Sequence, residues 1–141
     1  MARITASRGL TIGALSRLIG VNIETIRYYE RIDLMAEPPR TAGGQRDYQP
    51  EHVERLRFIR RARELGFGID DIRTLLTLAL RGSSSCAEAR DIASAHLADV
   101  RARLGDLGKL EKVLTATIEQ CNTQCCGASL PPCPILEVLQ A

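Results

Sequence analysis

The stretch from Ala87 to Cys121 contains no proline, and its apolar residues recur at steps of three, four or seven. The recurring positions are Leu97, Val100, Leu104, Leu107, Leu114, Ile118 and Cys121. This heptad-like spacing predicts one long helix with an apolar stripe along one side. At about 1.5 Å of rise per residue, such a helix would be about 50 Å long. A domain this small cannot bury so long a stripe, so we expect the helix to pair with a second copy of itself.

Two short helices joined by a glycine turn are predicted near the N-terminus. Apolar residues three and four apart favour a helix over 12–19, and Gly20 would end it. Asn22 can cap a second helix over 23–31. Residues 36–48 are rich in proline and glycine and predict a loop or a small hairpin. Together these elements are typical of a helix-turn-helix followed by a wing.

Further helices are predicted after the wing. Pro50 suits the first position of a third helix that runs to about Leu65 and stops at Gly66. A fourth helix is expected from Ile69 to about Leu80, followed by a linker over 81–85. Beyond the long helix, a cysteine-bearing loop leads to a short tail helix over 135–139. The sequence therefore predicts a mainly α fold.

The charge of the chain is unevenly distributed. Residues 1–66 carry twelve arginines against eight Asp and Glu, whereas residues 67–141 carry seven Lys and Arg against nine Asp and Glu. A basic N-terminal half that contains a helix-turn-helix favours a polyanion such as DNA. Polar residues near the start of the second helix, Thr25 among them, are placed for base edges, and Arg27 with its neighbouring tyrosines for phosphates. The arginines of the third helix fit equally well a solvated face paired with glutamates.

The five cysteines all lie in the second half of the chain. No stretch reaches the roughly 18 apolar residues of a membrane span, and no signal-peptide pattern is present, so we expect a cytoplasmic protein without a membrane partner. Thiols stay reduced in that compartment. The cysteines therefore favour metal binding or redox sensing over structural disulfides.

The placement of the thiols predicts a site shared between two chains. Cys86 opens the long helix and Cys121 ends it, so about 50 Å would separate them within one chain. In an antiparallel dimer, Cys86 of one chain comes beside Cys121 of the other, and Cys133 can complete a three-thiolate site. Cys125 and Cys126 are additional candidate ligands. Taken singly, Cys86 also fits a small buried thiol, and Cys121 fits an ordinary residue of the seam.

Specific motifs resemble the MerR family of transcription regulators. They are T-I-R-Y-Y-E in the second helix, R-x-Y in the wing and L-G-F…I…I-x-x-L-L across the third and fourth helices. The resemblance implies a homodimer with two winged helix-turn-helix domains joined by an antiparallel coiled coil. Such dimers bind a palindromic promoter with an overlong spacer and distort it on effector binding, so that RNA polymerase can use it. By position, Arg27, Tyr28, Arg46 and Tyr48 match the DNA-contacting motifs, and Asp47 departs from the wing's pattern.

The C-terminal half is most similar to the mercury-sensing branch of that family. Cys86 opens the long helix, Cys121 ends it and Cys133 starts C-P-I-L, so the resemblance implies these three as trigonal Hg(II) ligands. A cysteine at position 86 departs from the copper-sensing branch, which has serine there. The Cys125-Cys126 pair is similar to zinc sensors. Hg(II) is the expected effector, with Cd(II), Pb(II) and Zn(II) as alternatives for a site of soft thiolates.

Other classes of function fit less well. An iron–sulfur redox regulator would have cysteines spaced more like C-x2-C-x-C-x5-C than the C-x3-C-C-x6-C found here. That class of regulator also leaves Cys86 without a function. An enzyme is not expected, because C-x-x-C, a glycine-rich phosphate loop and H-E-x-x-H are all missing from the sequence. A drug-binding regulator would need a larger C-terminal domain. We expect a DNA-binding domain over 1–80, a linker and dimerisation helix over 81–121, and a metal-binding loop and tail helix over 122–141.

Overall fold

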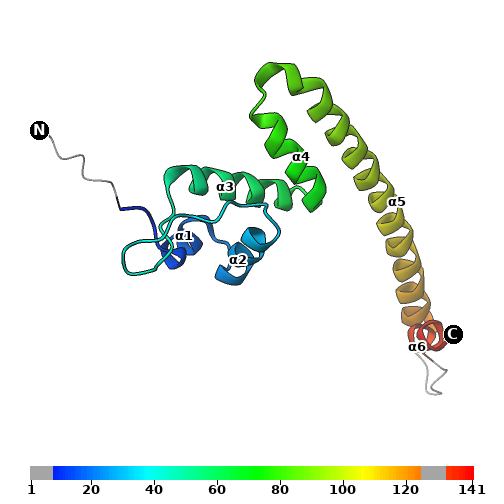
Figure 1. Ribbon diagram of the computed structural model, residues 1–141. Coiled ribbons are helices and arrows are strands. Elements are labelled where there is room, and N and C mark those ends of the chain that lie inside the picture. Colours follow the sequence, from blue (N-terminus) through cyan, green and yellow to red (C-terminus); the bar gives the residue numbers. More distant parts are fainter. Residues whose placement is uncertain (1–7, 125–132) are drawn as a thin grey trace, which may run out of the picture. The chain divides into compact units, whose positions relative to one another are not determined.

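A computed structural model describes residues 8–124 and 133–141. Figure 1 shows these residues as helices joined by short turns and one longer loop. In chain order they are α1 (Ile12–Ile19), α2 (Ile23–Arg31), α3 (Pro50–Glu64), α4 (Ile69–Ala79), the 3-10 turn η1 (Gly82–Ser85), α5 (Cys86–Gln124) and α6 (Pro134–Gln140). Extended pairing in the described part is limited to two isolated antiparallel bridges, between Leu10 and Tyr48 and between Arg40 and Arg46. The mainly α fold predicted from the sequence is confirmed.

Local capping fixes the two short helices where the sequence predicted them. The Thr11 side chain accepts a hydrogen bond from the backbone N–H of Ala14 at 3.2 Å, which starts α1. Gly20 ends α1 with φ of 76°, a left-handed conformation that glycine adopts without a side-chain clash. Asn22 then caps α2 by accepting from the N–H of Glu24 at 2.9 Å. The tight turn holds α2 against α1.

The chain divides into two compact units, one up to Ala89 and one from Arg90 onwards. The first unit contains α1 to α4, η1 and the opening turn of α5. Cys86 therefore belongs to the same unit as the helix-turn-helix. The functional division into 1–80, 81–121 and 122–141 stays a prediction.

An aliphatic core holds the first unit together. It joins α1, α2, α3 and α4 to Tyr48 of the wing through side chains that are almost fully covered. Helix α1 packs on both α2 and α3, and α3 packs on α4. The most deeply buried members are Leu15, Ile26, Leu34, Met35, Tyr48, Leu56, Ile59 and Ile72. Truncating one of the buried leucines or isoleucines to alanine would cost about 2–5 kcal/mol, so this core gives α2 a fixed support.

The second unit is dominated by α5. This helix extends the predicted one by a residue at its start and three at its end. Its apolar stripe stays in solvent within a single chain: Leu97 is 46 % exposed, Leu104 62 % and Leu114 61 %. Thr117 is the buried polar residue of the described part of this unit. None of the helices in the described residues combines the length and apolar character that crossing a membrane requires.

Candidate functional site

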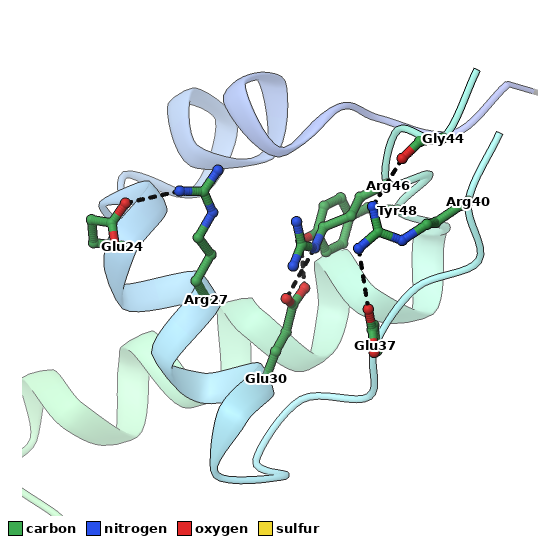
Figure 2. A network of polar contacts seen from close by, with 8 residues as sticks. All are labelled: Glu24, Arg27, Glu30, Glu37, Arg40, Gly44, Arg46 and Tyr48. Atoms are coloured by element: carbon green, nitrogen blue, oxygen red, sulfur yellow. Dashed lines mark hydrogen bonds and ion pairs between the residues drawn. The ribbon is translucent and has the colours of Figure 1, made fainter.

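The exposed face of α2 carries the polar groups predicted to meet DNA. Arg27 is exposed, and its Nη1 lies 3.0 Å from Oε1 of Glu24 one turn earlier. Both side chains are in solvent, so this ion pair is worth about 1 kcal/mol or less and leaves the guanidinium able to exchange partners. Tyr28 is 44 % exposed beside it, and Thr25 is half-buried. Figure 2 shows Arg27 and Glu24 together on this helix.

The wing is a short loop closed by its own hydrogen bonds. The N–H of Thr41 donates to the carbonyl of Gln45 at 2.7 Å, and Gly44 takes the left-handed conformation with φ of 81° at the tip. Arg40 reaches back along the wing, donating from Nη1 to the carbonyl of Gly44 at 2.9 Å and from Nη2 to Glu37 at 3.4 Å. Arg40 and Glu37 are both solvent-exposed. Their pair therefore shapes the wing surface without fixing it to another element.

A second carboxylate fixes the wing to α2. Glu30, at the end of α2, has a side chain only 6 % exposed. Its Oε2 accepts from Nε of Arg46 at 3.1 Å, and its Oε1 accepts from the hydroxyl of Tyr48 at 2.5 Å. Figure 2 shows both wing residues converging on this carboxylate. Burial raises the pKa of Tyr48 above its ordinary value, and the hydrogen bond to Glu30 raises it further.

This arrangement brings two of the five predicted DNA-binding residues to one surface. Arg27 and Arg46 line a common surface hollow together with Arg31. Because Glu30 occupies only the Nε edge of Arg46, the outer nitrogens of that guanidinium stay available for an anion. Tyr48 is placed differently from the prediction: its side chain is 1 % exposed and part of the core, so it has no surface to offer a phosphate. Its contribution in this structure is to position Glu30.

The spacing of Glu30 from its apolar neighbours is a sequence signal for a partly buried carboxylate. Glu30 lies four residues after Ile26 and one after Tyr29, and both of those side chains are buried. A carboxylate at that helical spacing points toward the core side, where it needs a partner. The R-x-Y of the wing supplies both partners. The R-x-Y motif predicts these two residues at DNA, whereas both contact Glu30 in the structure.

The arginines of α3 divide into inward and outward groups. Arg55 donates from Nε to the carbonyl of Leu34 at 2.7 Å, and Arg60 donates to the carbonyl of Ile19 at the end of α1. Arg60 also pairs with Glu64 at 2.8 Å. Arg57 and Arg61 are exposed. The solvated-face alternative therefore does not describe Arg55. It does describe Arg60, which is exposed and paired with Glu64, although Arg60 also holds a backbone carbonyl.

The candidate metal ligands lie at the ends of helices. Cys86 is the first residue of α5 and is exposed, Cys121 lies in the last turn of α5 and is half-buried, and Cys133 is the half-buried N-cap of α6. Cys125 and Cys126 lie outside the described residues. Within residues 8–124 and 133–141 of a single chain, no three His, Cys, Asp or Glu side chains gather into a metal-binding group. A three-thiolate site therefore needs an arrangement that one described chain does not provide.

Comparison with known proteins identifies the family. Residues 10–78 match a model described as MerR HTH family regulatory protein, and residues 53–117 match one described as MerR, DNA binding. The chain is 39 % identical over 128 residues to the mercuric resistance operon regulatory protein of Bacillus cereus, covering 91 % of this chain and 95 % of that protein. The chain belongs to the MerR family. The resemblance predicted from the T-I-R-Y-Y-E and wing motifs is confirmed, and relatives of this kind are transcription regulators rather than enzymes.

Other transcription regulators match the chain over nearly its whole length. The transcriptional regulator ZntR of Escherichia coli K12 is 37 % identical, with 92 % of this chain and 91 % of that protein covered. The lead(II) complex of PbrR691 from Ralstonia metallidurans CH34 superposes with a TM-score of 0.72 at 35 % identity, covering 92 % and 98 % of the two chains. The mercury(II) complex of MerR from Bacillus megaterium MB1 has a TM-score of 0.67 at 33 % identity, covering 94 % and 100 %.

Proposed function

We propose that this chain is a dimeric transcription regulator that binds promoter DNA and responds to Hg(II) through thiolates of two subunits. The observation that carries the proposal is the position of the thiols on one uninterrupted helix. Cys86 is its first residue and Cys121 lies in its last turn, so about 50 Å of helical rise separates them. One ion can meet both residues only if they come from different chains.

The exposed stripe of α5 supports the same arrangement. Leu104, Leu107 and Ile118 are each more than half exposed in the single chain, which is unfavourable for apolar side chains on one helix face. An antiparallel partner would cover these side chains and, by the same pairing, place its Cys121 beside Cys86. Cys133, which is the N-cap of α6, would supply the third thiolate. The antiparallel pairing of two α5 helices would thus both form the dimer and bring the three thiolates together.

The donor set favours a soft ion. Three thiolates without an oxygen or nitrogen ligand suit Hg(II), Cd(II) and Pb(II) better than Mg(II) or Ca(II). The 39 % identity to mercuric resistance regulators supports Hg(II). The likeness to ZntR and to the lead(II) complex of PbrR691 supports a Zn(II) or Pb(II) sensor as the second candidate. Cd(II) is a further alternative because it too suits soft thiolates. When bound, the ion would link the two chains.

The helix-turn-helix unit supplies the DNA-binding surface of the proposal. Arg27 and Tyr28 lie on the exposed face of α2, Thr25 is half-buried on the same helix, and Arg46 of the wing lies beside Arg27. Tyr48 acts through Glu30 instead of touching DNA. The expected partner is a palindromic promoter bound by the homodimer, with RNA polymerase acting on that promoter in the cytoplasm.

Metal titration of the reduced dimer tests the effector. Hg(II), Cd(II), Pb(II) and Zn(II) are added separately, and ultraviolet thiolate-to-metal absorption and stoichiometry are recorded against a competing thiol. We expect Hg(II) to bind most tightly and to switch on transcription from the operator in a purified system. Selective response to Zn(II) or Pb(II) would move the assignment to the second candidate. Brown protein with visible absorption would favour the iron–sulfur alternative.

Single substitutions test the ligands. Cys86→Ser, Cys121→Ser and Cys133→Ser should each abolish metal-dependent induction while operator binding stays at the parent level. Cys125→Ser and Cys126→Ser serve as comparisons, because these thiols are additional candidates. A Cys86→Ser protein that responds to Hg(II) like the parent would remove the shared site.

A further inference from the structure

We infer that Arg73 of α4 is a positioning residue that couples the segment beside Cys86 to the end of the DNA-reading helix α2. The inference rests on the proposed function, because it concerns how a metal bound at Cys86 changes the DNA-binding unit. All residues in the argument belong to the unit that ends at Ala89.

Arg73 bridges two consecutive backbone carbonyls just after α2. Its Nη2 donates to the carbonyl of Ile32 at 2.7 Å, and its Nη1 donates to the carbonyl of Asp33 at 3.1 Å. Ile32 is the C-cap of α2. The carbonyls at a helix C-terminus lack intrahelical partners and carry partial negative charge, so a guanidinium there is doubly favourable. A planar fork with two donors fits this pair in a way that a lysine cannot reproduce.

The turn that Arg73 holds is tightly defined. Asp33 has φ of 56°, a left-handed conformation that is uncommon for a residue with a side chain. The next carbonyl, that of Leu34, accepts from Nε of Arg55 on α3 at 2.7 Å. Three successive carbonyls are therefore each held by an arginine from another helix. Leu34 itself is fully buried, which anchors the turn in the core.

The other end of α4 is attached to the residue before Cys86. The hydroxyl of Ser85, 8 % exposed, lies 2.9 Å from the carbonyl of Leu78 and 2.6 Å from that of Gly82. Leu78 is itself 3 % exposed near the end of α4. A change in the position of Cys86 is therefore passed through Ser85 to the last turn of α4.

Helix α4 then acts as a rigid connection. In the described part of the chain its backbone lies against α3 and η1, and its buried Ile72 and Leu76 belong to the core that α2 also joins. Arg73 is the side chain that extends from α4 to the end of α2 by hydrogen bonds. A tilt of α4 would pull on the C-terminal end of α2 and change how that helix enters the DNA groove. This gives the metal signal a physical route through named contacts.

Arg73→Ala, Arg73→Lys and the matched control Arg63→Ala test the inference. Arg63 also donates to a backbone carbonyl, that of Phe67 at 3.0 Å, but this bond lies at the end of its own helix. Four quantities are measured in the full-length dimer: Hg(II) binding, operator affinity without metal, metal-dependent transcription, and hydrogen exchange of the backbone over residues 29–36.

The expected result separates coupling from folding. Arg73→Ala should bind Hg(II) and apo operator like the parent, lose metal-dependent induction by about tenfold or more, and exchange faster over 29–36, since allosteric couplings typically amount to about 5–150-fold. Arg73→Lys should recover part of the induction, and Arg63→Ala should match the parent in all four measurements.

Three results would overturn the inference. Full metal-dependent induction in Arg73→Ala would show that Arg73 does not couple the two sites. Unchanged hydrogen exchange over residues 29–36 would show that Arg73 does not hold the turn after α2. A loss of induction that only follows lost operator affinity would make Arg73 a stability residue. If the parent protein responds to none of the metals, the proposed function is wrong and the coupling with it. If the parent responds and Arg73→Ala responds equally, the proposed function stands and only the coupling is wrong.

Discussion

The Nε of Arg46 donates to Oε2 of Glu30 across 3.1 Å, although sixteen positions separate the two residues in the chain. This contact makes the wing and the end of α2 parts of one surface. Arg46 is 25 % exposed in its side chain and Glu30 only 6 %, so the carboxylate is the fixed partner and the guanidinium is the one that faces outward. A half-buried arginine is in this way given one orientation before DNA arrives.

Glu30→Ala should therefore reduce discrimination between operator and random DNA. The substitution removes a negative charge near the phosphates, which favours nonspecific binding, but it releases Arg46 and leaves the hydroxyl of Tyr48 without its acceptor. We expect the ratio of operator to random-sequence affinity to fall about tenfold, since phosphate contacts set the register of the protein on DNA. Competition binding at fixed salt measures the ratio.

Glu37→Ala is the control for that substitution. Glu37 pairs with Arg40 in the same region, but both side chains are solvent-exposed. Glu37→Ala removes the same charge without releasing a fixed guanidinium. The ratio of operator to random-sequence affinity should therefore stay within about twofold of the parent, as expected for a weak exposed pair. Equal losses in the two variants would mean that Glu30 acts through charge alone.

Arg27→Ala should flatten the salt dependence of operator binding. Each phosphate neutralised by the protein contributes about −0.9 to the slope of log affinity against log salt, so loss of one contact reduces the slope by about one. Lys109→Ala removes a positive charge on α5, where Lys109 is exposed and pairs weakly with Asp106, and should leave the slope unchanged. An Arg27→Ala protein with the parent's slope would place Arg27 outside the interface.

Tyr48→Phe should change stability at alkaline pH. Burial, followed by the hydrogen bond to Glu30, raises the pKa of Tyr48 above 10.0 in the folded protein. The folded state thus holds the phenolic proton more tightly than the unfolded chain, so this contribution is complete below about pH 10 and is lost as the pH rises beyond it. Tyr48→Phe should cost about 1 kcal/mol at pH 7 and flatten the decline above pH 10.

Urea unfolding across pH 8–11.5 measures this difference, with Tyr28→Phe as the control because Tyr28 is exposed. If the parent and Tyr48→Phe lose stability in parallel above pH 10, the buried tyrosine is not the titrating group. If Tyr28→Phe flattens the decline as much as Tyr48→Phe does, the effect belongs to tyrosines in general.

Leu104→Glu should break the dimer. Leu104 is 62 % exposed in the single chain and lies in the middle of the α5 stripe. A carboxylate buried there against a second apolar helix would be strongly unfavourable, so sedimentation should report a monomer with much weaker operator binding. Ala102→Glu, two residues away on the opposite side of the helix, should stay dimeric. A dimeric Leu104→Glu protein would show that the stripe is not the interface.

Local structure was predictable from the sequence because its determinants are local. Gly20, Asn22 and Pro50 act within a few residues of their own positions, and the helix bounds that they predicted are those of the structure. The long helix followed from the missing proline and the recurring leucines. Its apolar stripe was recognised for the same reason, since helical periodicity depends only on spacing.

Contacts between distant positions were not predictable in the same way. Glu30 meets Tyr48 across eighteen positions, and Arg73 meets Ile32 across forty-one. No spacing rule connects such pairs, because they depend on how α2, the wing and α4 pack around the core. The motif alone therefore predicts Tyr48 at the DNA surface, whereas its side chain is buried. The three thiols pose a further problem, because their proposed meeting requires a second chain.

Mixed dimers test the shared thiolate site most directly. A heterodimer pairs one Cys86→Ser subunit with one Cys121→Ser subunit. In an antiparallel dimer it keeps one complete ligand set, with Cys86 from the Cys121→Ser subunit and Cys121 and Cys133 from the Cys86→Ser subunit. Each homodimer of these variants has no complete set. We predict that the purified heterodimer regains Hg(II) binding and metal-dependent transcription, while both homodimers stay silent. A silent heterodimer beside a responsive parent would contradict a site built from two subunits.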